Sequence, residues 1–256
     1  MDPQSIQKAA QLIHTARHVV VFTGAGHSTP SGVPDFRSTG TGLWSRVDPM
    51  IVASIEIFRQ HPRAFFDWSR PLMRLMLEAQ PNAAHLALAE LEQMGKLRAV
   101  ITQNIDNLHQ RAGSSRVLEL HGHWQESTCL QCHKVVPSIT YLDEWLESGA
   151  VPHCECGGVL KPNVILFGEM LPQDVLAAAQ AEAMACDLML VVGSSLTVMP
   201  AAAFPQIALE GGAQLVILNR DPTHYDGRAA VVMHQDLEET LPAIVAAFKE
   251  IRPDVG

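Results

Sequence analysis

Short apolar runs rich in β-branched residues recur along this chain, and they constrain its fold more than any other feature. Their centres are continuously apolar, which is typical of parallel strands covered on both faces. Helix-like segments alternate with several of them, including one after Asn82, Gln173–Ala185 and Pro200–Glu210. The pattern predicts an α/β protein with a doubly wound parallel sheet. The expected strands are His18–Phe22, Leu97–Ile101, Val117–Leu120, Asn163–Phe167, Leu188–Val192, Leu215–Leu218 and Ala230–Met233.

Two segments interrupt this alternation. Residues 39–80 carry helical signals and aromatic side chains without a good strand, and residues 124–160 hold four clustered cysteines. We interpret both as parts of a second, smaller domain: 39–80 as a helical insertion and 124–160 as a metal-binding module. The sheet domain is then discontinuous. It is assigned residues 1–38, 81–123 and 161–256.

The net charge and the lack of long apolar runs argue against several classes of protein. The formal net charge of −9 argues against nonspecific binding to nucleic acid or to an anionic membrane. No apolar run is long enough to span a bilayer, and the first residues lack the apolar core of a secretory signal. We therefore expect a cytoplasmic protein without direct nucleic-acid or membrane binding.

The first expected strand ends in Gly24-Ala25-Gly26. Glycines after a strand let the backbone approach a pyrophosphate, although a tight turn explains this stretch equally well. A polar loop containing Ser28 follows and leads to Asp35, Phe36 and Arg37. These three residues combine an acceptor, a stacking ring and a phosphate-binding base. Taken alone, a surface turn with a local ion pair explains them better.

Polar residues crowd the end of the next expected strand: Gln103, Asn104, Asp106, Asn107 and His109. In open α/β sheets the carboxyl ends of the strands are where ligands bind. Amides can hold a carboxamide or ribose hydroxyls, and Asp106 can accept a hydrogen bond. The alternative is a capped loop, with Asn104 or Asp106 at a helix N-terminus.

His121 follows the expected strand Val117–Leu120 and precedes a glycine. Neutral imidazole is the usual general base near pH 7, and this position suits an exposed functional side chain. We place His121 ahead of His123 as the candidate base. His85, inside an expected helix, is interpreted as structural.

Four of the five cysteines form two closely spaced pairs, Cys129 with Cys132 and Cys154 with Cys156. Two such pairs can close a tetrahedral Cys₄ site, which leaves zinc no open position for catalysis. Two disulfides or free thiols are the less favoured alternatives in a reducing compartment. The second pair is CxC, and the glycines 157 and 158 after it can supply the backbone freedom that a tighter turn needs.

Taken together, these motifs resemble the sirtuins, the NAD-dependent protein-lysine deacylases. They appear in family order between about Val19 and Leu237, and their combination is specific although each motif alone is weak. The matching stretches are Gly24–Gly26 with Ser28, Ser31–Arg37, Thr102–His109, His121-Gly122, the four cysteines, Lys161–Val164, Phe167–Glu169, Leu171-Pro172, Gly193–Leu196 and Asn219.

The resemblance implies a Rossmann-like domain that binds NAD, a small domain with one structural zinc, and NAD and peptide in the cleft between them. His121 would act as general base, and Asn104 would also serve catalysis. Products would be free lysine, nicotinamide and 2′-O-acyl-ADP-ribose. The peptide would pair with the backbone near Val164, Phe167, Gly168 and Glu169. The implied NAD contacts are Gly24, Ala25, Gly26, Ser28, Asp35, Phe36, Arg37, Gln103, Asn104, Ile105, Asp106, His121, Gly193, Ser194, Ser195, Asn219, Asp236 and Leu237.

The chain departs from the family pattern at two places. His27 stands where sirtuins usually have an apolar residue, next to the implied nicotinamide pocket, and the second cysteine pair is CxC. The Tyr-x-x-Arg pair of desuccinylating members is also missing from the stretch Phe65–Arg74. An acyl pocket lined by Phe, Trp, Leu and Met there would favour neutral acyl groups, because an unpaired buried carboxylate is costly.

Two other functions use the same features. Mono-ADP-ribosyl transfer or NAD hydrolysis would employ the same pocket with another nucleophile. A catalytically silent NAD sensor or zinc scaffold would belong to a different class, and the presence of both His121 and Asn104 argues against it.

Overall fold

The computed structural model describes residues 2–35, 42 and 47–251. The chain divides into two compact units. The first comprises Met1–Ser31, Gln80–Leu120 and Asp174–Gly256, and the second comprises Gly32–Ala79 and His121–Gln173. Residues 32–38, 121–123 and 161–173, which we assigned to the sheet domain from the sequence, thus belong to the second unit.

A six-stranded parallel sheet forms the centre of the first unit, which confirms the predicted doubly wound α/β class. The strand order β3-β2-β1-β7-β8-β9 places β1 between β2 and β7. Strands β1 and β7 are buried at every position, as their continuous apolar sequences require. The strands are β1 (Val19–Thr23), β2 (Leu97–Thr102), β3 (Val117–Glu119), β7 (Leu188–Val192), β8 (Gln214–Leu218) and β9 (Val231–Met233).

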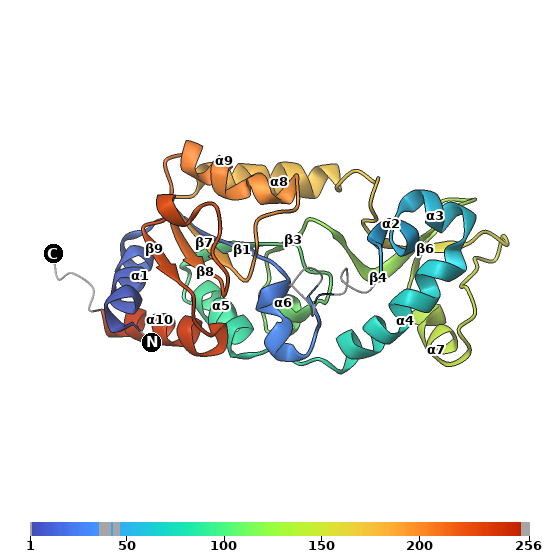
Figure 1. Ribbon diagram of the computed structural model, residues 1–256, viewed down its shortest axis with the longest axis horizontal. Helices are drawn as coiled ribbons and strands as arrows, with labels where there is room; N and C mark the ends of the chain where they lie inside the picture. The colour runs from blue at the N-terminus through green and yellow to red at the C-terminus, as the bar shows by residue number, and fades with distance from the viewer. Residues whose placement is uncertain (1, 36–41, 43–46, 252–256) are drawn as a thin grey trace. The chain divides into compact units, whose positions relative to one another are not determined.

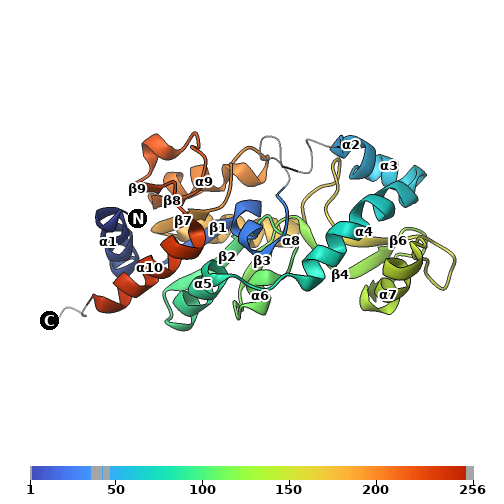
Figure 2. The same ribbon diagram turned by 60° about the horizontal axis from the view of Figure 1, so that its bottom comes forward.

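Helices cover both faces of this sheet. Helices α1, α5 and α10 lie on one side, and α8 and α9 lie on the other (Figures 1 and 2). Side chains cap several of them: Asp2 caps α1, Asn82 caps α5 as predicted, and Asp236 caps α10. The bounds are α1 (Pro3–Thr15), α5 (Ala83–Gln93), α6 (Leu108–Arg111), α8 (Gln173–Ala185), α9 (Phe204–Glu210) and α10 (Leu237–Glu250).

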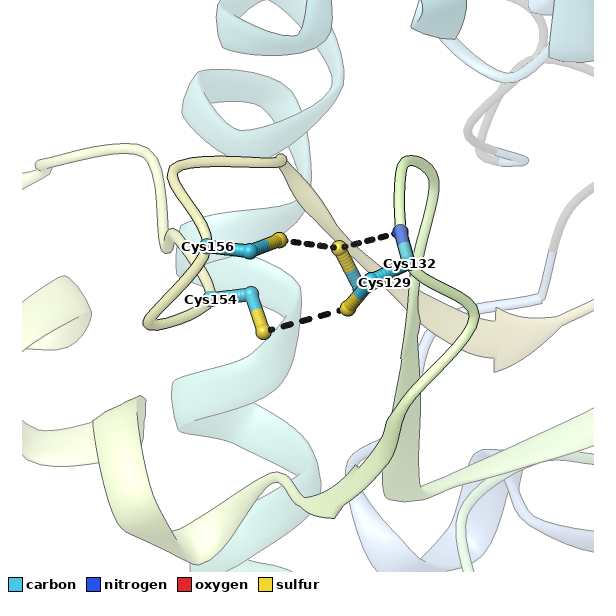
Figure 3. Close-up of side chains that lie close together, drawn as sticks. All are labelled: Cys129, Cys132, Cys154 and Cys156. Atoms are coloured by element: carbon cyan, nitrogen blue, oxygen red, sulfur yellow. Dashed lines mark hydrogen bonds between the residues drawn. The ribbon is translucent and has the colours of Figure 1, made fainter.

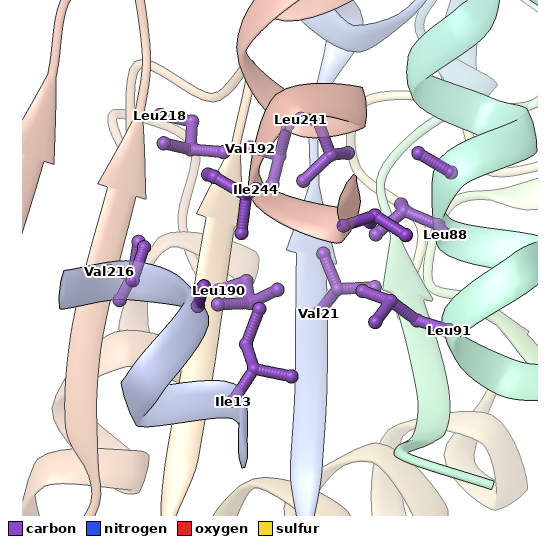
Figure 4. Packing of buried hydrophobic residues seen from close by; sticks show 14 of the residues in the cluster. Ile13, Val21, Leu88, Leu91, Leu190, Val192, Val216, Leu218, Leu241 and Ile244 are labelled. Carbon is purple, nitrogen blue, oxygen red and sulfur yellow. The ribbon is translucent and has the colours of Figure 1, made fainter. Parts of the chain in front are cut away.

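The main core lies between the sheet and helices α1, α5 and α10. Figure 4 shows Val21, Leu190 and Val216 of the sheet pointing toward Ile13 of α1 and Ile244 of α10. Each is at most 1% exposed, and burying one such side chain contributes roughly 1.5–3 kcal/mol. This core holds the strands in register and so fixes the positions of the loops at their carboxyl ends.

The second unit combines a three-stranded sheet with helices, and its strands are ordered β5-β4-β6. An aromatic cluster fills it, in which Phe65 stacks on Trp124 and Phe66 contacts Trp145. None of the described helices is long and apolar enough to cross a membrane. The elements are α2 (Pro49–Val52), α3 (Ile55–Gln60), α4 (Pro62–Glu78), β4 (Gly122–Cys129), β5 (Val135–Pro137), α7 (Ile139–Ser148) and β6 (Leu160–Val164).

One expected strand was wrong in its place and its direction. The run Asn163–Phe167 was grouped with the parallel strands, but the strand that forms is β6, which ends at Val164 and pairs antiparallel with β4. Its partner β4, whose polar and apolar residues alternate too weakly to stand out, was not predicted. An apolar run has the same appearance whichever sheet it joins, so only the tertiary pairing distinguishes the two cases.

Candidate active site

The carboxyl ends of β1, β2 and β7 bring several predicted site residues together, because parallel strands end at the same edge of a sheet. The N–H of Gly26 donates to the carbonyl of Gly193 at 2.9 Å. Gln103 Nε2 donates to Ser194 Oγ, also at 2.9 Å. The glycine loop, the polar segment after β2 and the loop after β7 therefore form one contiguous group.

Glycine is required where the two loops touch. Gly193 has φ +63°, and a Cβ added there would lie 2.2 Å from the backbone nitrogen of His27. A Cβ on Gly26 would lie 2.9 Å from the carbonyl oxygen of Gly193. Glycine thus lets two backbones approach closely at this edge of the sheet.

We expect Gly193→Ala to destabilise the protein by at least about 2 kcal/mol, because left-handed backbone strain adds to a steric clash with backbone atoms. Gly212→Ala is the matched control: Gly212 has φ +89° but open space where its Cβ would be. Denaturant unfolding of both variants measures the difference. An equal loss of unfolding free energy in both variants would show that the close approach of the loops does not contribute to stability.

Asn104 is held rigidly at this edge, and its side chain is only 9% exposed. Its Nδ2 donates to the carbonyl of Gly24 and to Ser28 Oγ, both at 3.0 Å. Its backbone N–H donates to Thr102 Oγ1. These bonds use both hydrogens of the amide, so its orientation is fixed relative to the glycine loop.

Asp106 makes a capping contact of the kind that the sequence suggested, although Asn107 occupies the N-cap position of α6. It is a buried acid in the polar segment, and its Oδ1 accepts the N–H of Leu108 at the start of α6. Burial raises the pKa of this carboxyl, while a hydrogen bond from Ser28 opposes the shift. Ile105, next to it, is partly buried.

The remaining predicted contacts of the first unit differ in exposure. Ala25 is partly buried and Ser195 is exposed. Asn219 is buried, and its Nδ2 donates to the carbonyl of Asp221. Asp236 is exposed and accepts the N–H of Glu238 as a helix cap, with Leu237 buried behind it.

In the second unit, Asp35 is partly buried, and Phe36 and Arg37 lie outside the described residues. His121 is partly exposed in the turn before β4, and its carbonyl accepts the N–H of Ile165 at 2.8 Å. Gly122 has φ +70°, and a Cβ there would lie 1.9 Å from the carbonyl oxygen of Asn163. The close packing of this glycine on β6 determines where the backbone of His121 lies.

The segment expected to pair with a peptide is held by Lys161, which the sequence placed in a family motif without giving it a role. Lys161 is 8% exposed, and its Nζ contacts Glu169 Oε2 at 2.9 Å and the carbonyls of Pro162 and Val164. Burial lowers the pKa of Lys161, and the charge of Glu169 opposes that shift. Lysine beside proline in an apolar run was the available signal.

The backbone of Phe167 is already used inside the chain. Its N–H donates to Ala53 and its carbonyl accepts from Ile55. Gly168, with φ +88°, makes no backbone hydrogen bond to the described residues.

The four cysteines converge as predicted. Cys129 is the last residue of β4 and Cys132 lies in the turn after it, while Cys154 and Cys156 lie in the loop before β6 (Figure 3). Their Sγ atoms lie within 4.8 Å of one another, with Cys129–Cys156 at 3.5 Å and Cys132–Cys154 at 3.7 Å. Four thiolates at about 2.3 Å from a tetrahedral zinc ion would be about 3.8 Å apart, so the set fits zinc.

Local backbone geometry supports this set. Gly157 has φ +87°, and a Cβ on Gly158 would lie 2.6 Å from Cys129 Sγ, so both glycines are needed beside the CxC pair. The backbone N–H of Cys132 donates to Cys129 Sγ and lowers the pKa of that thiol. This shift favours the Cys129 thiolate, the form that zinc binds, whereas hydrogen bonds with the Cys156 and Cys129 thiols raise the pKa of Cys132.

The chain is similar to known proteins over nearly its whole length. Residues 24–200 match the model of the Sir2 family. It is 49% identical to "NAD-dependent protein deacylase 2" of Archaeoglobus fulgidus over 97% of this chain and 98% of that protein.

Solved structures agree. One Sir2 enzyme, from work on the mechanism and regulation of these enzymes, superposes with a TM-score of 0.91 at 48% identity, covering 97% of this chain and 99% of its own. Another, bound to a deacetylated p53 peptide and 3′-O-acetyl ADP ribose, superposes with a TM-score of 0.89 at 40% identity, covering 94% of this chain and 97% of its own.

Proposed function

This chain belongs to the Sir2 family and is an NAD-dependent protein-lysine deacylase, and we propose which of its residues carry the reaction. The main support comes from the residues that meet at the carboxyl edge of the six-stranded sheet. There the glycine loop packs on Gly193, and two hydrogen bonds fix the Asn104 amide.

NAD supplies the ribose carbon that accepts the acyl oxygen as nicotinamide leaves. Backbone N–H groups of the glycine loop and of Gly193–Ser195 bind its phosphates. Gln103, Asn104 and Asp106 bind the nicotinamide end and its ribose. The family resemblance assigns Asp35, Phe36 and Arg37 to the same ligand. Asn219 and Asp236 with Leu237 contact the adenosine end. Because the Asn104 amide is already oriented, it loses little freedom when it binds substrate.

His121 acts as the general base that takes a proton from a ribose hydroxyl. Its partly exposed position and the adjoining Gly122 suit a side chain that must reach a substrate. The acylated peptide binds along Val164–Glu169, where the Lys161–Glu169 pair stabilises the backbone. The Cys₄ zinc is structural, since four thiolates leave no open position.

Incubating an acyl-lysine peptide library with and without NAD, followed by mass spectrometry, tests this function. We expect NAD-dependent loss of acyl groups and an equal amount of acyl-ADP-ribose. ADP-ribosylated protein, or ADP-ribose formed without deacylation, would instead support transfer to another nucleophile or NAD hydrolysis.

We further propose that neutral acyl groups are preferred, since the arginines near the expected acyl site are engaged elsewhere. Arg74 Nη2 donates to the carbonyl of Leu146 near the end of α7, and Arg70 lies against Gly149, which follows α7. Asp67 pairs with Arg63. Phe65 and Phe66, expected to line an acyl pocket, are at most 1% exposed and belong to the core of the second unit.

We expect kcat/KM for acetyl-lysine to exceed that for succinyl-lysine at least about tenfold on one peptide, because a buried carboxylate without a cationic partner is costly. Arg74→Gln should leave this ratio unchanged. A preference for succinyl-lysine that disappears in Arg74→Gln would contradict the proposal and identify the residue responsible.

We also propose that the protein is cytoplasmic and does not bind nucleic acid directly. The cysteine usage supports a cytoplasmic location. The net charge of −9 supports a protein that does not bind nucleic acid directly.

A further inference from the structure

Three histidines of the first unit converge beside the glycine loop. His27 follows Gly26, His85 lies in α5 and His109 lies in α6. The ring of His27 is 4.2 Å from that of His85 and 4.9 Å from that of His109, measured between centroids. Each residue offers a ring nitrogen within 4.8 Å of the others, and each is at most 1% exposed.

Most nitrogens of this histidine cluster lack a hydrogen-bond partner. Among the described residues, both ring nitrogens of His27, Nε2 of His85 and Nδ1 of His109 are buried and unpartnered. Buried polar atoms are normally satisfied, and unpartnered ones in a native fold call for an explanation such as a bound ion. Burial lowers the pKa of all three imidazoles, so they are neutral at pH 7 with lone pairs available for a metal.

His109 has the environment of a metal ligand. Thr23 Oγ1 donates to Thr102 Oγ1, so it accepts the Nε2–H of His109 at 3.0 Å. This bond leaves Nδ1 unprotonated. Metal-binding histidines are typically oriented in this way, with the second ring nitrogen donating to a fixed acceptor.

His85 would bind a metal at some cost. Its Nδ1 accepts the backbone N–H of Asn82 in the capping box of α5, at 3.4 Å. Coordination through Nε2 requires the proton on Nδ1, so this contact would break. The lost contact is weak, because 3.4 Å is longer than a usual hydrogen bond. The helix cap itself would remain, since the backbone N–H groups of Ala84 and His85 still donate to the Asn82 side chain.

We propose that His27, His85 and His109 bind one divalent transition-metal ion of the class that prefers imidazole, such as Zn²⁺, Co²⁺, Ni²⁺ or Cu²⁺. Ligand nitrogens of a tetrahedral ion are about 3.3 Å apart, so the rings need to close inward from their present spacing. Three histidines leave one position for water or hydroxide. The ion would tie the glycine loop to α5 and α6.

Metal uptake tests the proposal. Purified protein that retains its Cys₄ metal is incubated separately with each of the four ions, desalted and analysed for metal content. We expect one additional equivalent for at least one ion in the parent protein and none in His27→Leu, which removes one ligand and fills the space with an apolar side chain. His14→Leu, a histidine of α1 outside the cluster, should behave like the parent.

Two further measurements separate this site from the cysteines. Bound Co²⁺ should show the spectrum of nitrogen and oxygen ligands, without additional sulfur-to-cobalt charge transfer. The ion should raise the thermal unfolding temperature of the parent but not that of His27→Leu. No additional equivalent in the parent with any of the four ions, or the same uptake in His27→Leu, would overturn the proposal.

Discussion

Replacing His121 with alanine is expected to lower the deacylation rate about 10²–10⁴-fold, the usual range for loss of a general base. NAD binding should persist, because the proposed phosphate-binding loops belong to the first unit and keep their own packing on Gly193. Acyl-ADP-ribose formation measured by mass spectrometry gives the rate. Calorimetric titration with NAD gives the affinity.

His123→Ala is the control for this experiment. His123 lies two positions further along, in β4, and tests whether any histidine near the turn has the same effect. We expect its deacylation rate to stay within a few-fold of the parent. Nicotinamide exchange, which precedes the step assigned to the base, should survive in His121→Ala. Equal deacylation rates in His121→Ala and the parent would remove His121 from the mechanism.

Replacing Cys132 with alanine is expected to abolish zinc binding at the Cys₄ site and to unfold much of the second unit. Structural zinc sites bind with an apparent free energy of about 10–16 kcal/mol, which matches or exceeds the roughly 5–15 kcal/mol stability of a whole domain. Elemental analysis measures the loss of metal, and thermal unfolding monitored by tryptophan fluorescence measures the loss of structure. Trp124 and Trp145 of the aromatic cluster report on this unit.

Cys186→Ala is the matched control, since Cys186 is a buried cysteine that lies in the first unit, away from the zinc set in sequence. It should retain one zinc at the Cys₄ site. Retention of that zinc by Cys132→Ala would show that this cysteine is not a ligand.

Several features could be predicted from the sequence because short segments encode them. Continuous β-branched runs indicate buried parallel strands, and all but one of the expected runs in fact join the six-stranded sheet. Two closely spaced cysteine pairs with glycines beside the second indicate a metal site, and the sulfur atoms do converge. Glycines after β1 were expected to approach a pyrophosphate, which stays a prediction; the structure shows that Gly26 approaches the backbone of Gly193.

Other features depend on which distant segments meet. Lys161 and Glu169 were visible as parts of motifs, but their ion pair forms only because the chain turns back after β6. Arg70 and Arg74 lie in the stretch Phe65–Arg74 compared with desuccinylating members, but only the structure shows that both contact the end of α7 or the residue after it. Phe65 and Phe66 suit a pocket and a core equally well.

The three clustered histidines show most clearly what the sequence indicates and what only the tertiary structure decides. From the sequence, His27 was a polar residue at a position that is usually apolar, and His85 was a structural residue in a helix. Their meeting with His109 follows from the way β1 and β2 pair and α5 and α6 pack beside them. Local spacing therefore determined which backbone shapes and ligand pairs were available. Long-range packing alone decided which side chains were buried together, because burial depends on neighbours far away in the chain.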